Sequence, residues 1–200
     1  MTTRTMRANG EASRRRILDA ASEIAGERGY SGTSISDVSK LSGLPNSSIY
    51  WHFKDKDALF AAVIEDSYSR WFEDYRERSR GPLASPGEAL SRLHESLLGF
   101  PAFLRFGHLV ILEQHDEELS ARSSFLKIRK RALKDLGESF VKDIGCDRAQ
   151  GRTLAALSLA LVDGAFLAGA AGETTLTNNG ALGAMFDAYV ATLSTDKRRR

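Results

Sequence analysis

Hydrophobic side chains recur every three or four positions through most of the chain, which is the spacing of one face of an α-helix. Segments that alternate apolar and polar residues, as a half-buried strand does, are short and poor in β-branched residues. Gly29, Gly43 and Pro101 interrupt the helical pattern where helices are expected to end or begin. The pattern predicts an all-α protein of about nine helices, over residues 13–28, 34–42, 45–52, 55–78, 87–98, 102–114, 118–144, 148–171 and 178–194.

The chain is expected to divide into a small N-terminal head and a larger body. The divisions are a disordered basic arm at 1–12, the three-helix head at 13–60, the body at 61–195 and a basic tail at 196–200. The boundary between head and body falls inside the fourth expected helix rather than in a flexible linker. One continuous helix is therefore expected to belong to both parts.

Composition and charge narrow the class of protein. The 200 residues carry 28 Lys and Arg against 26 Asp and Glu, so a formal net charge of +2 favours a nucleic-acid partner only if the cations are clustered. The single cysteine, Cys146, excludes an intrachain disulfide and is typical of a reducing compartment. Charged residues interrupt every apolar run, and no apolar segment of a secretory signal follows the N-terminus, so we expect a cytoplasmic protein without a membrane partner.

Residues 33–59 hold the most informative pattern, two short helices joined by a tight turn. Ser34 and Asp37 form a capping box at the start of the first helix, and Gly43 ends it. The inward residues of this helix are expected to be Ile35, Val38 and Leu41. Pro45 suits the first position of the next helix. This spacing predicts a helix-turn-helix motif.

The outer face of the second helix of this motif is too polar for ordinary packing. Its side chains are hydrogen-bonding or flat amphipathic groups, namely Asn46, Ser47, Ser48, Tyr50, Trp51 and His52. Lys56, in the first turn of the following helix, opposes the helix dipole, which suggests a phosphate partner. The pattern favours DNA binding, and the alternative is that Tyr50, Trp51 and His52 pack against the body.

These residues closely resemble the DNA-binding head of TetR-type repressors. The resemblance covers residues 13–60 and rests on Gly29-Tyr30, residues 33–38, Ser42-Gly43-Leu44, residues 49–53 and residues 54–59. It implies a bacterial homodimer that binds a palindromic operator and releases it when a small molecule enters the C-terminal domain. It also implies phosphate contacts from Thr33, Ser34, Tyr50, His52 and Lys56, and groove contacts from Asn46, Ser47, Ser48 and Trp51.

Two positions in the DNA-binding segment depart from the family pattern. Pro45 stands where serine is usual, which removes a capping hydroxyl that would also reach DNA. Ser47 stands where glycine is frequent, which changes how closely the backbone approaches the groove. The exact contacts at Pro45 and Ser47 therefore stay open.

Other kinds of site find little support in the sequence. His108 and His115 are seven residues apart, too far for two imidazoles to share one ion unaided, so we expect no metal there or with Glu113. No nucleophile with a base, paired carboxylates or phosphate-binding glycine loop is present, so we expect no catalytic residue and no cofactor. A small helical enzyme and a DNA-binding dimer without an effector remain the alternatives.

The body is larger than dimerisation alone requires, which favours a ligand-binding role. Candidate ligand contacts are Trp71, Phe103, Phe106, His108, Leu109, Glu113, Phe125 and Phe166, each of which also suits a core. Their few polar groups point to a small, largely apolar effector.

The helices at 148–171 and 178–194 are expected to form the homodimer interface. The first of them has an apolar stripe of Leu154, Leu157, Leu161 and Ala165. Its small residues Ala160, Gly164 and Ala168 would admit a second helix closely.

Overall fold

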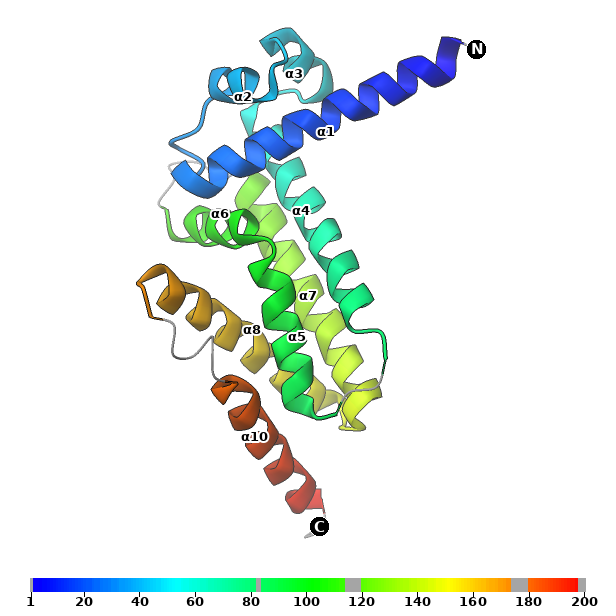
Figure 1. Cartoon of the computed structure of the whole chain (residues 1–200), viewed down its shortest axis with the longest axis vertical. Coiled ribbons are helices and arrows are strands. Elements are labelled where there is room, and N and C mark those ends of the chain that lie inside the picture. Colours follow the sequence, from blue (N-terminus) through cyan, green and yellow to red (C-terminus); the bar gives the residue numbers. More distant parts are fainter. Residues whose placement is uncertain (1, 82–83, 114–119, 174–179, 198–200) are drawn as a thin grey trace. The chain divides into compact units, whose positions relative to one another are not determined.

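The computed structural model describes residues 2–81, 84–113, 120–173 and 180–197, with the side chains of 2–8 and 193–197 left aside. Every regular element in these residues is an α-helix, which confirms the all-α expectation (Figure 1). The helices are α1 Thr2–Arg28, α2 Ile35–Ser42, α3 Asn46–His52, α4 Lys56–Arg78, α5 Pro86–Leu98, α6 Pro101–Leu112, α7 Ser120–Ile144, α8 Arg148–Ala170 and α10 Ala181–Lys197.

Helix α1 differs from its expected extent. It begins at Thr2, so the expectation of a disordered arm at 1–12 is wrong for residues 2–12. Gly10 is the poorest helix former in that stretch, and a glycine inside a helix costs only about 1 kcal/mol relative to alanine. Low hydrophobicity therefore did not prevent the helix from continuing toward the N-terminus. In the expected tail, α10 continues to Lys197, and residues 198–200 lie outside the described residues.

The described helices group into two compact units that differ from the expected head and body. The first unit comprises Met1–Arg70 and Phe100–Ile128, and the second comprises Trp71–Gly99 and Arg129–Arg200. Helices α4 and α7 each contribute residues to both units. Helix α6, expected in the body, belongs to the unit that contains α1, α2 and α3.

In the first unit, α1 packs against α6 and α2. The approach to α6 is close, because a Cβ on Gly26 would lie 2.8 Å from the Ala102 Cα. The carboxylate of Asp57 on α4 accepts hydrogen bonds from the backbone N–H groups of Ser120 (3.0 Å) and Ala121 (3.3 Å), which caps the start of α7. The core that results holds Ile17, Leu18, Ile49, Leu59, Phe60 and Phe106.

The packing of α2 corrects one inward assignment. Val38 is buried and Ile35 is half-buried, but Leu41 is 48% exposed. Ser42, one position further along, is buried in its place near the end of the helix. With 3.6 residues per turn, Ser42 lies about 40° around the helix from Val38, whereas Leu41 lies about 60° away on the other side, so Ser42 is closer to the inward face.

In the second unit, α10 packs against α5, and α5 packs against α8. Asp187 on α10 binds the start of α5: its carboxylate accepts hydrogen bonds from the Gly87 backbone N–H (2.6 Å) and the Ser85 hydroxyl (2.9 Å). The backbones come together at Gly87 and Gly183, where a Cβ on Gly183 would lie 3.3 Å from the Gly87 carbonyl oxygen. Glycine at both positions therefore permits this crossing.

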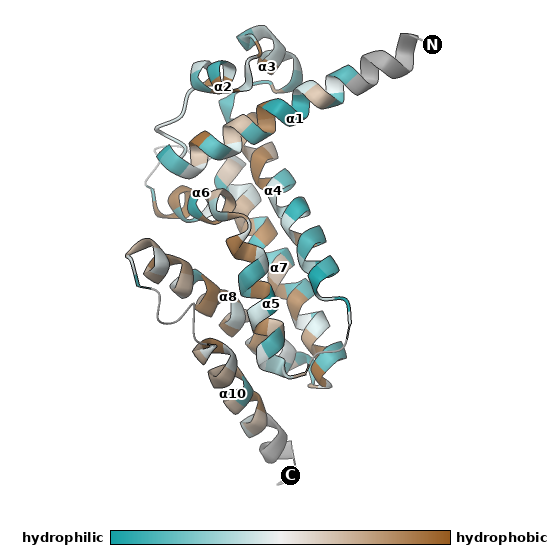
Figure 2. Cartoon of the chain, viewed as in Figure 1, coloured by the Kyte–Doolittle hydropathy of each residue, from teal (hydrophilic) through white to brown (hydrophobic). Residues whose placement is uncertain are grey.

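Helix α8 is apolar along much of its length (Figure 2). Leu154 and Ala165, expected in the dimer stripe, are instead buried in the core of the second unit. Leu157 is 38% exposed and Leu167 is 52% exposed. By length and composition α8 is apolar enough to cross a membrane, whereas charged residues were expected to interrupt every apolar run. One third (33%) of its most apolar 18-residue window is buried in the chain. Much of an apolar helix is thus uncovered.

Candidate nucleic-acid interface

The turn between α2 and α3 is built from local hydrogen bonds. Ser34 caps α2, with its Oγ accepting from the Asp37 backbone N–H (3.1 Å) while the Asp37 carboxylate accepts from the Ser34 N–H (3.1 Å). Gly43 has φ +64°, the left-handed region that favours glycine, and ends the helix. The Ser39 hydroxyl then donates to the Leu44 carbonyl (2.7 Å). The capping box and the helix-turn-helix are as the sequence predicted.

Helix α3 is fixed by one face and uncovered on the other (Figure 1). Ile49 is fully buried and Phe53, just after the helix, is buried beneath it. On the outer face, Tyr50 is 54% exposed and Trp51 is 77% exposed. Tyr50 and Trp51 are therefore not buried, unlike in the packing alternative, whereas His52 is half-buried.

Three of the four predicted groove contacts lie at the start of α3. Asn46 and Ser47 are exposed and Ser48 is half-buried. Pro45 is the N-cap of α3, with φ −65°, rather than its first helical residue as expected. Its side chain makes no capping hydrogen bond to the first backbone N–H groups of α3. Asn46, Ser47 and Trp51 are therefore exposed side chains that α3 could present to a groove.

Thr33 does not belong to this surface. Its side chain is only 2% exposed, and its hydroxyl donates to the Gly29 carbonyl (2.8 Å). The expected phosphate contact of Thr33 is therefore replaced by a structural role in the turn between α1 and α2. Ser34, next to it, stays exposed.

His52 and Lys56 lie at the far end of α3 and the start of α4, and partial burial affects both. Burial lowers the pKa of His52, and the nearby charge of Arg14 lowers it further, so the imidazole is neutral at neutral pH. Burial also lowers the pKa of Lys56, while the charge of Glu113 raises it in part. The Lys56 Nζ lies 4.3 Å from the centroid of the Tyr30 ring, a cation–π contact that positions the ammonium.

Helix α1 contacts the helix-turn-helix through residues that no sequence motif indicated. Arg16 Nη2 donates to the Ser42 carbonyl in the turn (2.6 Å), and Arg14 lies 5.4 Å over the Phe53 ring centroid. A Cβ on Gly10 would lie 3.9 Å from the Trp51 ring, so α1 passes beside the exposed aromatic. The run Arg14-Arg15-Arg16 was the available signal, but only the fold brings it against the motif.

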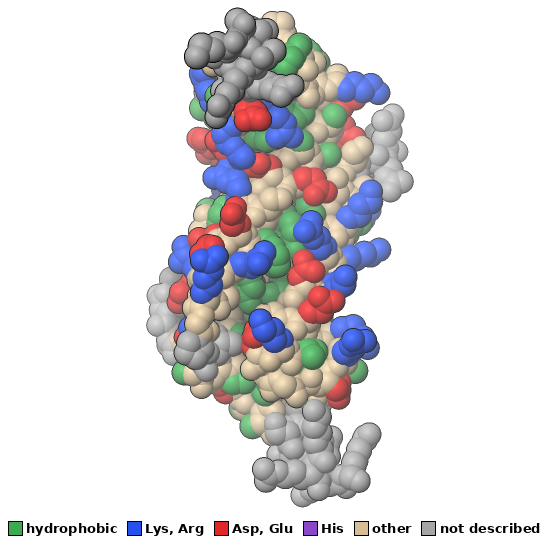
Figure 3. Space-filling view, turned by 90° about the vertical axis from the view of Figure 1, so that its right-hand side faces the viewer, with side chains coloured by type: hydrophobic (Ala, Val, Ile, Leu, Met, Phe, Trp, Pro, Cys, Tyr) green, Lys and Arg blue, Asp and Glu red, His purple; other side chains and the backbone are tan. Residues whose placement is uncertain are grey.

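Positive and negative side chains are mixed on one face of the molecule. Figure 3 shows Lys and Arg side chains interspersed with Asp and Glu over the face that it presents, so that face has no single sign. Between α1 and α4, Arg15 pairs with Asp66 (2.6 Å) and Arg70 with Asp19 (2.7 Å). Exposed ion pairs of this kind contribute little to stability. Because their charges are paired, Arg15 and Arg70 are less available to bind phosphates.

The candidate effector contacts are divided between the two units. Trp71 and Phe166 belong to the second unit, and the other six belong to the first. Phe103 lies 6.0 Å from Phe125 and Phe106 lies 5.4 Å from Phe60 (ring centroids), so these aromatics pack in the core of the first unit. In the remainder of this set, the His108 Nδ1 lies 2.7 Å from the Leu104 carbonyl oxygen, and Leu109 and Glu113 are half-buried. His115, weighed as a metal ligand, lies outside the described residues, and those described form no group of three or more ligands able to hold a metal.

Comparison with known proteins points to one family. Residues 17–63 match the model of bacterial regulatory proteins of the tetR family. The chain is 35% identical over 98 residues to the HTH-type transcriptional regulator AcrR of Shigella flexneri, which is 48% of this chain and 43% of that protein. It is 32% identical over 62 residues to the HTH-type transcriptional regulator QacR of Staphylococcus aureus, 31% of this chain and 33% of that protein. The matches span less than half the length of these curated relatives.

Solved structures extend the likeness of fold beyond the matched segment. A transcriptional regulator from Rhodococcus sp. Rha1 is 26% identical with a TM-score of 0.66, covering 92% of this chain and 96% of that one. A TetR transcriptional regulator from Legionella pneumophila has a TM-score of 0.73 at 21% identity, covering 87% and 95%. These relatives are transcriptional regulators rather than enzymes. The motif and its match to the family model identify residues 17–63 as the N-terminal segment of the tetR family of bacterial regulatory proteins, and the described helices share the fold of solved regulators of that family.

Proposed function

We propose that the protein is a cytoplasmic, homodimeric DNA-binding repressor that releases a palindromic operator when a small, largely apolar effector binds its C-terminal part. The observation that carries the DNA-binding half is the uncovered outer face of α3, with Trp51 77% exposed, on a helix fixed by the fully buried Ile49. A large aromatic left exposed on a firmly held short helix suits an interface.

The direct reading of bases by this helix is limited. Helix α3 contains no Arg or Lys, so it lacks the common bidentate contact to guanine. Asn46 is its side chain suited to bidentate contact with adenine. Phosphate contacts from Ser34, Tyr50, His52 and Lys56, together with the shape of the duplex, would supply the rest of the specificity.

The dimer in this proposal forms through α8 and α10. Leu157 and Leu167 on α8, and Met185 and Tyr189 on α10, leave apolar side chains uncovered in the single chain. A Cβ on Gly164 would meet nothing within 4 Å in the single chain, so the backbone of α8 is open to a second helix there. A two-fold axis through these helices would pair the same surface on both chains.

The effector site in this proposal lies in the second unit, where two buried polar groups lack hydrogen-bond partners among the described residues. These are His94 Nε2 on α5 and Ser158 Oγ on α8, whose side chains are 8% and 0% exposed. Buried polar groups without partners are costly, and an effector with one hydrogen-bonding end would satisfy them. One protein of this fold, the regulator FadR from Bacillus subtilis, was crystallised in complex with stearoyl-CoA, and at 19% identity it shares the fold alone.

Release of DNA would follow from the helices that both units share. In a dimer that reads two successive major grooves, the recognition helices must lie about 34–36 Å apart or a multiple of that repeat. Helix α4 runs from Lys56 in the first unit to Trp71 and Tyr75 in the second, where the two rings stack at 6.1 Å. An effector that displaces Trp71 would tilt α4 and change that spacing. Shifting a 99:1 population to 1:99 takes about 5.5 kcal/mol of differential binding.

Selection of bound duplexes from a random library by the full chain tests the DNA-binding half. We expect an inverted repeat, and we expect Trp51→Ala and Asn46→Ala to weaken binding to it. A library that yields no enriched sequence would overturn the proposal.

The proposed effector response is tested with a ligand that raises the unfolding temperature of the protein. This ligand is titrated into the complex of the protein with its operator, and the operator affinity is measured. Ser158→Ala should weaken the ligand's effect without harming the fold, and Trp71→Phe should reduce coupling to DNA. Operator affinity that stays constant at saturating ligand would leave a constitutive DNA-binding dimer.

A further inference from the structure

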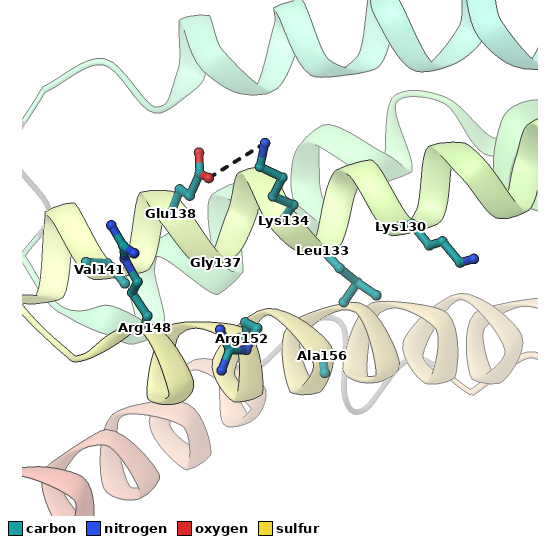
Figure 4. A pocket seen from close by; sticks show the side chains of 9 residues that line it. All are labelled: Lys130, Leu133, Lys134, Gly137, Glu138, Val141, Arg148, Arg152 and Ala156. Carbon is teal, nitrogen blue, oxygen red and sulfur yellow. Dashed lines mark ion pairs between the residues drawn. The ribbon is translucent and has the colours of Figure 1, made fainter.

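A groove separates α7 from α8 in the second unit (Figure 4). Its volume is about 660 Å³, within the usual range for a small-molecule site. It is lined by Lys130, Leu133, Lys134, Gly137, Glu138, Val141, Arg148, Arg152 and Ala156. None of these is a candidate effector or DNA contact.

The groove has an apolar floor that the packing of the two helices creates. A Cβ on Gly151 would lie 2.7 Å from the Gly137 carbonyl oxygen, so α7 and α8 touch backbone to backbone at this point. The neighbouring Leu133 and Val141 are half-buried on the α7 side, and Ala156 is exposed on the α8 side. Small residues on both helices thus leave a hollow that aliphatic side chains line.

The rim of the groove is strongly basic. Four cations, Lys130, Lys134, Arg148 and Arg152, face one anion, Glu138, which leaves +3 (four minus one). Glu138 pairs only loosely with Lys134, at 3.9 Å between highly exposed groups. The described ion pairs include none formed by Lys130, Arg148 or Arg152, so these three cations are available to a ligand.

Arg148 and Arg152 are placed to act together. They are four residues apart in the first turns of α8, so they lie on one side of the helix. Figure 4 shows both at the α8 wall, with Arg148 reaching toward Val141 on α7. Guanidinium groups bind carboxylate or phosphate through paired hydrogen bonds, and the start of a helix also favours an anion.

We propose that this groove binds an anionic amphiphile, with its carboxylate or phosphate at Arg148 and Arg152 and its apolar part along Leu133, Val141 and Ala156. The basic rim matches the head group and the aliphatic floor matches the chain. A free inorganic anion would leave the floor uncovered, and a neutral apolar molecule would leave the cations unused. This site is separate from the effector site proposed between α5 and α8.

Calorimetric titration of the full chain with decanoate, below its micellar concentration, tests the proposal. Decyl phosphate carries the alternative head group, and decyltrimethylammonium is the cationic control with the same chain. We expect both anions to bind, the tighter of them identifying the preferred head group, and the cation to bind at least about tenfold more weakly. Equal binding of decanoate and decyltrimethylammonium would overturn the proposal.

Variants locate the binding and distinguish it from general electrostatics. Arg148→Gln with Arg152→Gln should weaken decanoate about tenfold or more, whereas Arg76→Gln with Lys142→Gln removes the same charge from exposed positions outside the groove and should leave it unchanged. Ala156→Phe should block the chain by filling the exposed floor.

Equal effects of the two double variants, or an unchanged affinity in Ala156→Phe, would refute the site. A decanoate affinity that falls as the protein concentration rises would show that a second copy covers the groove, and it would also overturn the proposal.

Discussion

The uncovered face of α8 permits a quantitative prediction about dimerisation. Fully burying a leucine side chain contributes about 1.5–3 kcal/mol relative to leaving it in water. Leu157 is 38% exposed, so covering the remainder in a dimer would contribute about 0.6–1.1 kcal/mol for each chain. A two-fold interface contains the residue twice, so its two copies contribute about 1.1–2.3 kcal/mol, a factor of about 6 to 45 in the dimer constant.

Leu157→Asp should exceed that loss, because the variant also buries two carboxylates at the interface. We expect the dimer dissociation constant to rise by more than about a hundredfold, measured by sedimentation equilibrium. Leu112→Asp is the matched control, since Leu112 is 71% exposed near the end of α6, and it should leave the constant unchanged. Thermal unfolding of the monomeric state should be similar in both variants.

Two results would refute this reasoning. Wild-type protein that sediments as a monomer at micromolar concentration would show that α8 does not form the interface. A Leu157→Asp variant that remains as dimeric as Leu112→Asp would place the interface elsewhere on the chain.

The structure supports three further predictions. Lys56→Gln should weaken binding to all duplexes alike and reduce the slope of log affinity against log salt by about one unit, seen by fluorescence anisotropy; an unchanged slope would remove Lys56 from the phosphate contacts. Burial lowers the pKa of His94, with Glu95 opposing the shift, so the unfolded state binds its proton more readily and the free energy of unfolding should fall as pH drops below the ordinary value of 6.5. Denaturant titrations should show a weaker decline in His94→Gln, and an equal decline would assign it to other groups. Ser158→Ala removes a buried hydroxyl without a described partner, so thermal unfolding without ligand should shift upward or not at all, and a clear loss of stability would mean that the hydroxyl is bonded.

Local chemistry explains why most of the fold could be predicted from the sequence. Helix starts and stops depend on neighbours within a few residues, as in the capping box of Ser34 and Asp37 or the left-handed Gly43. The exposure of Trp51 could also be predicted from its helix. The outer face of α3 is polar without the Lys and Glu of an ordinary solvated helix, which indicated a binding surface.

Long-range packing explains what the sequence did not predict. The grouping of α6 with α1 depends on the approach of Gly26 to Ala102, which no local pattern encodes. Thr33 matched a family phosphate contact by position, yet the turn buries it and uses its hydroxyl internally. In the groove of α7 and α8, Lys130 and Arg152 are individually ordinary surface cations, and only the pairing of the two helices brings them together.

The ratio of affinities for a selected duplex and for the same duplex with its sequence scrambled, measured at physiological salt, tests the central claim most directly. If α3 reads DNA, wild-type protein should bind the selected duplex about a thousandfold more tightly or better. Asn46→Ala should lower the ratio by a factor of about 5 to 150, which corresponds to about 1–3 kcal/mol, while leaving thermal unfolding unchanged because Asn46 is exposed. A wild-type ratio near one, or a ratio insensitive to Asn46 and Trp51, would contradict the assignment of α3 as the recognition helix.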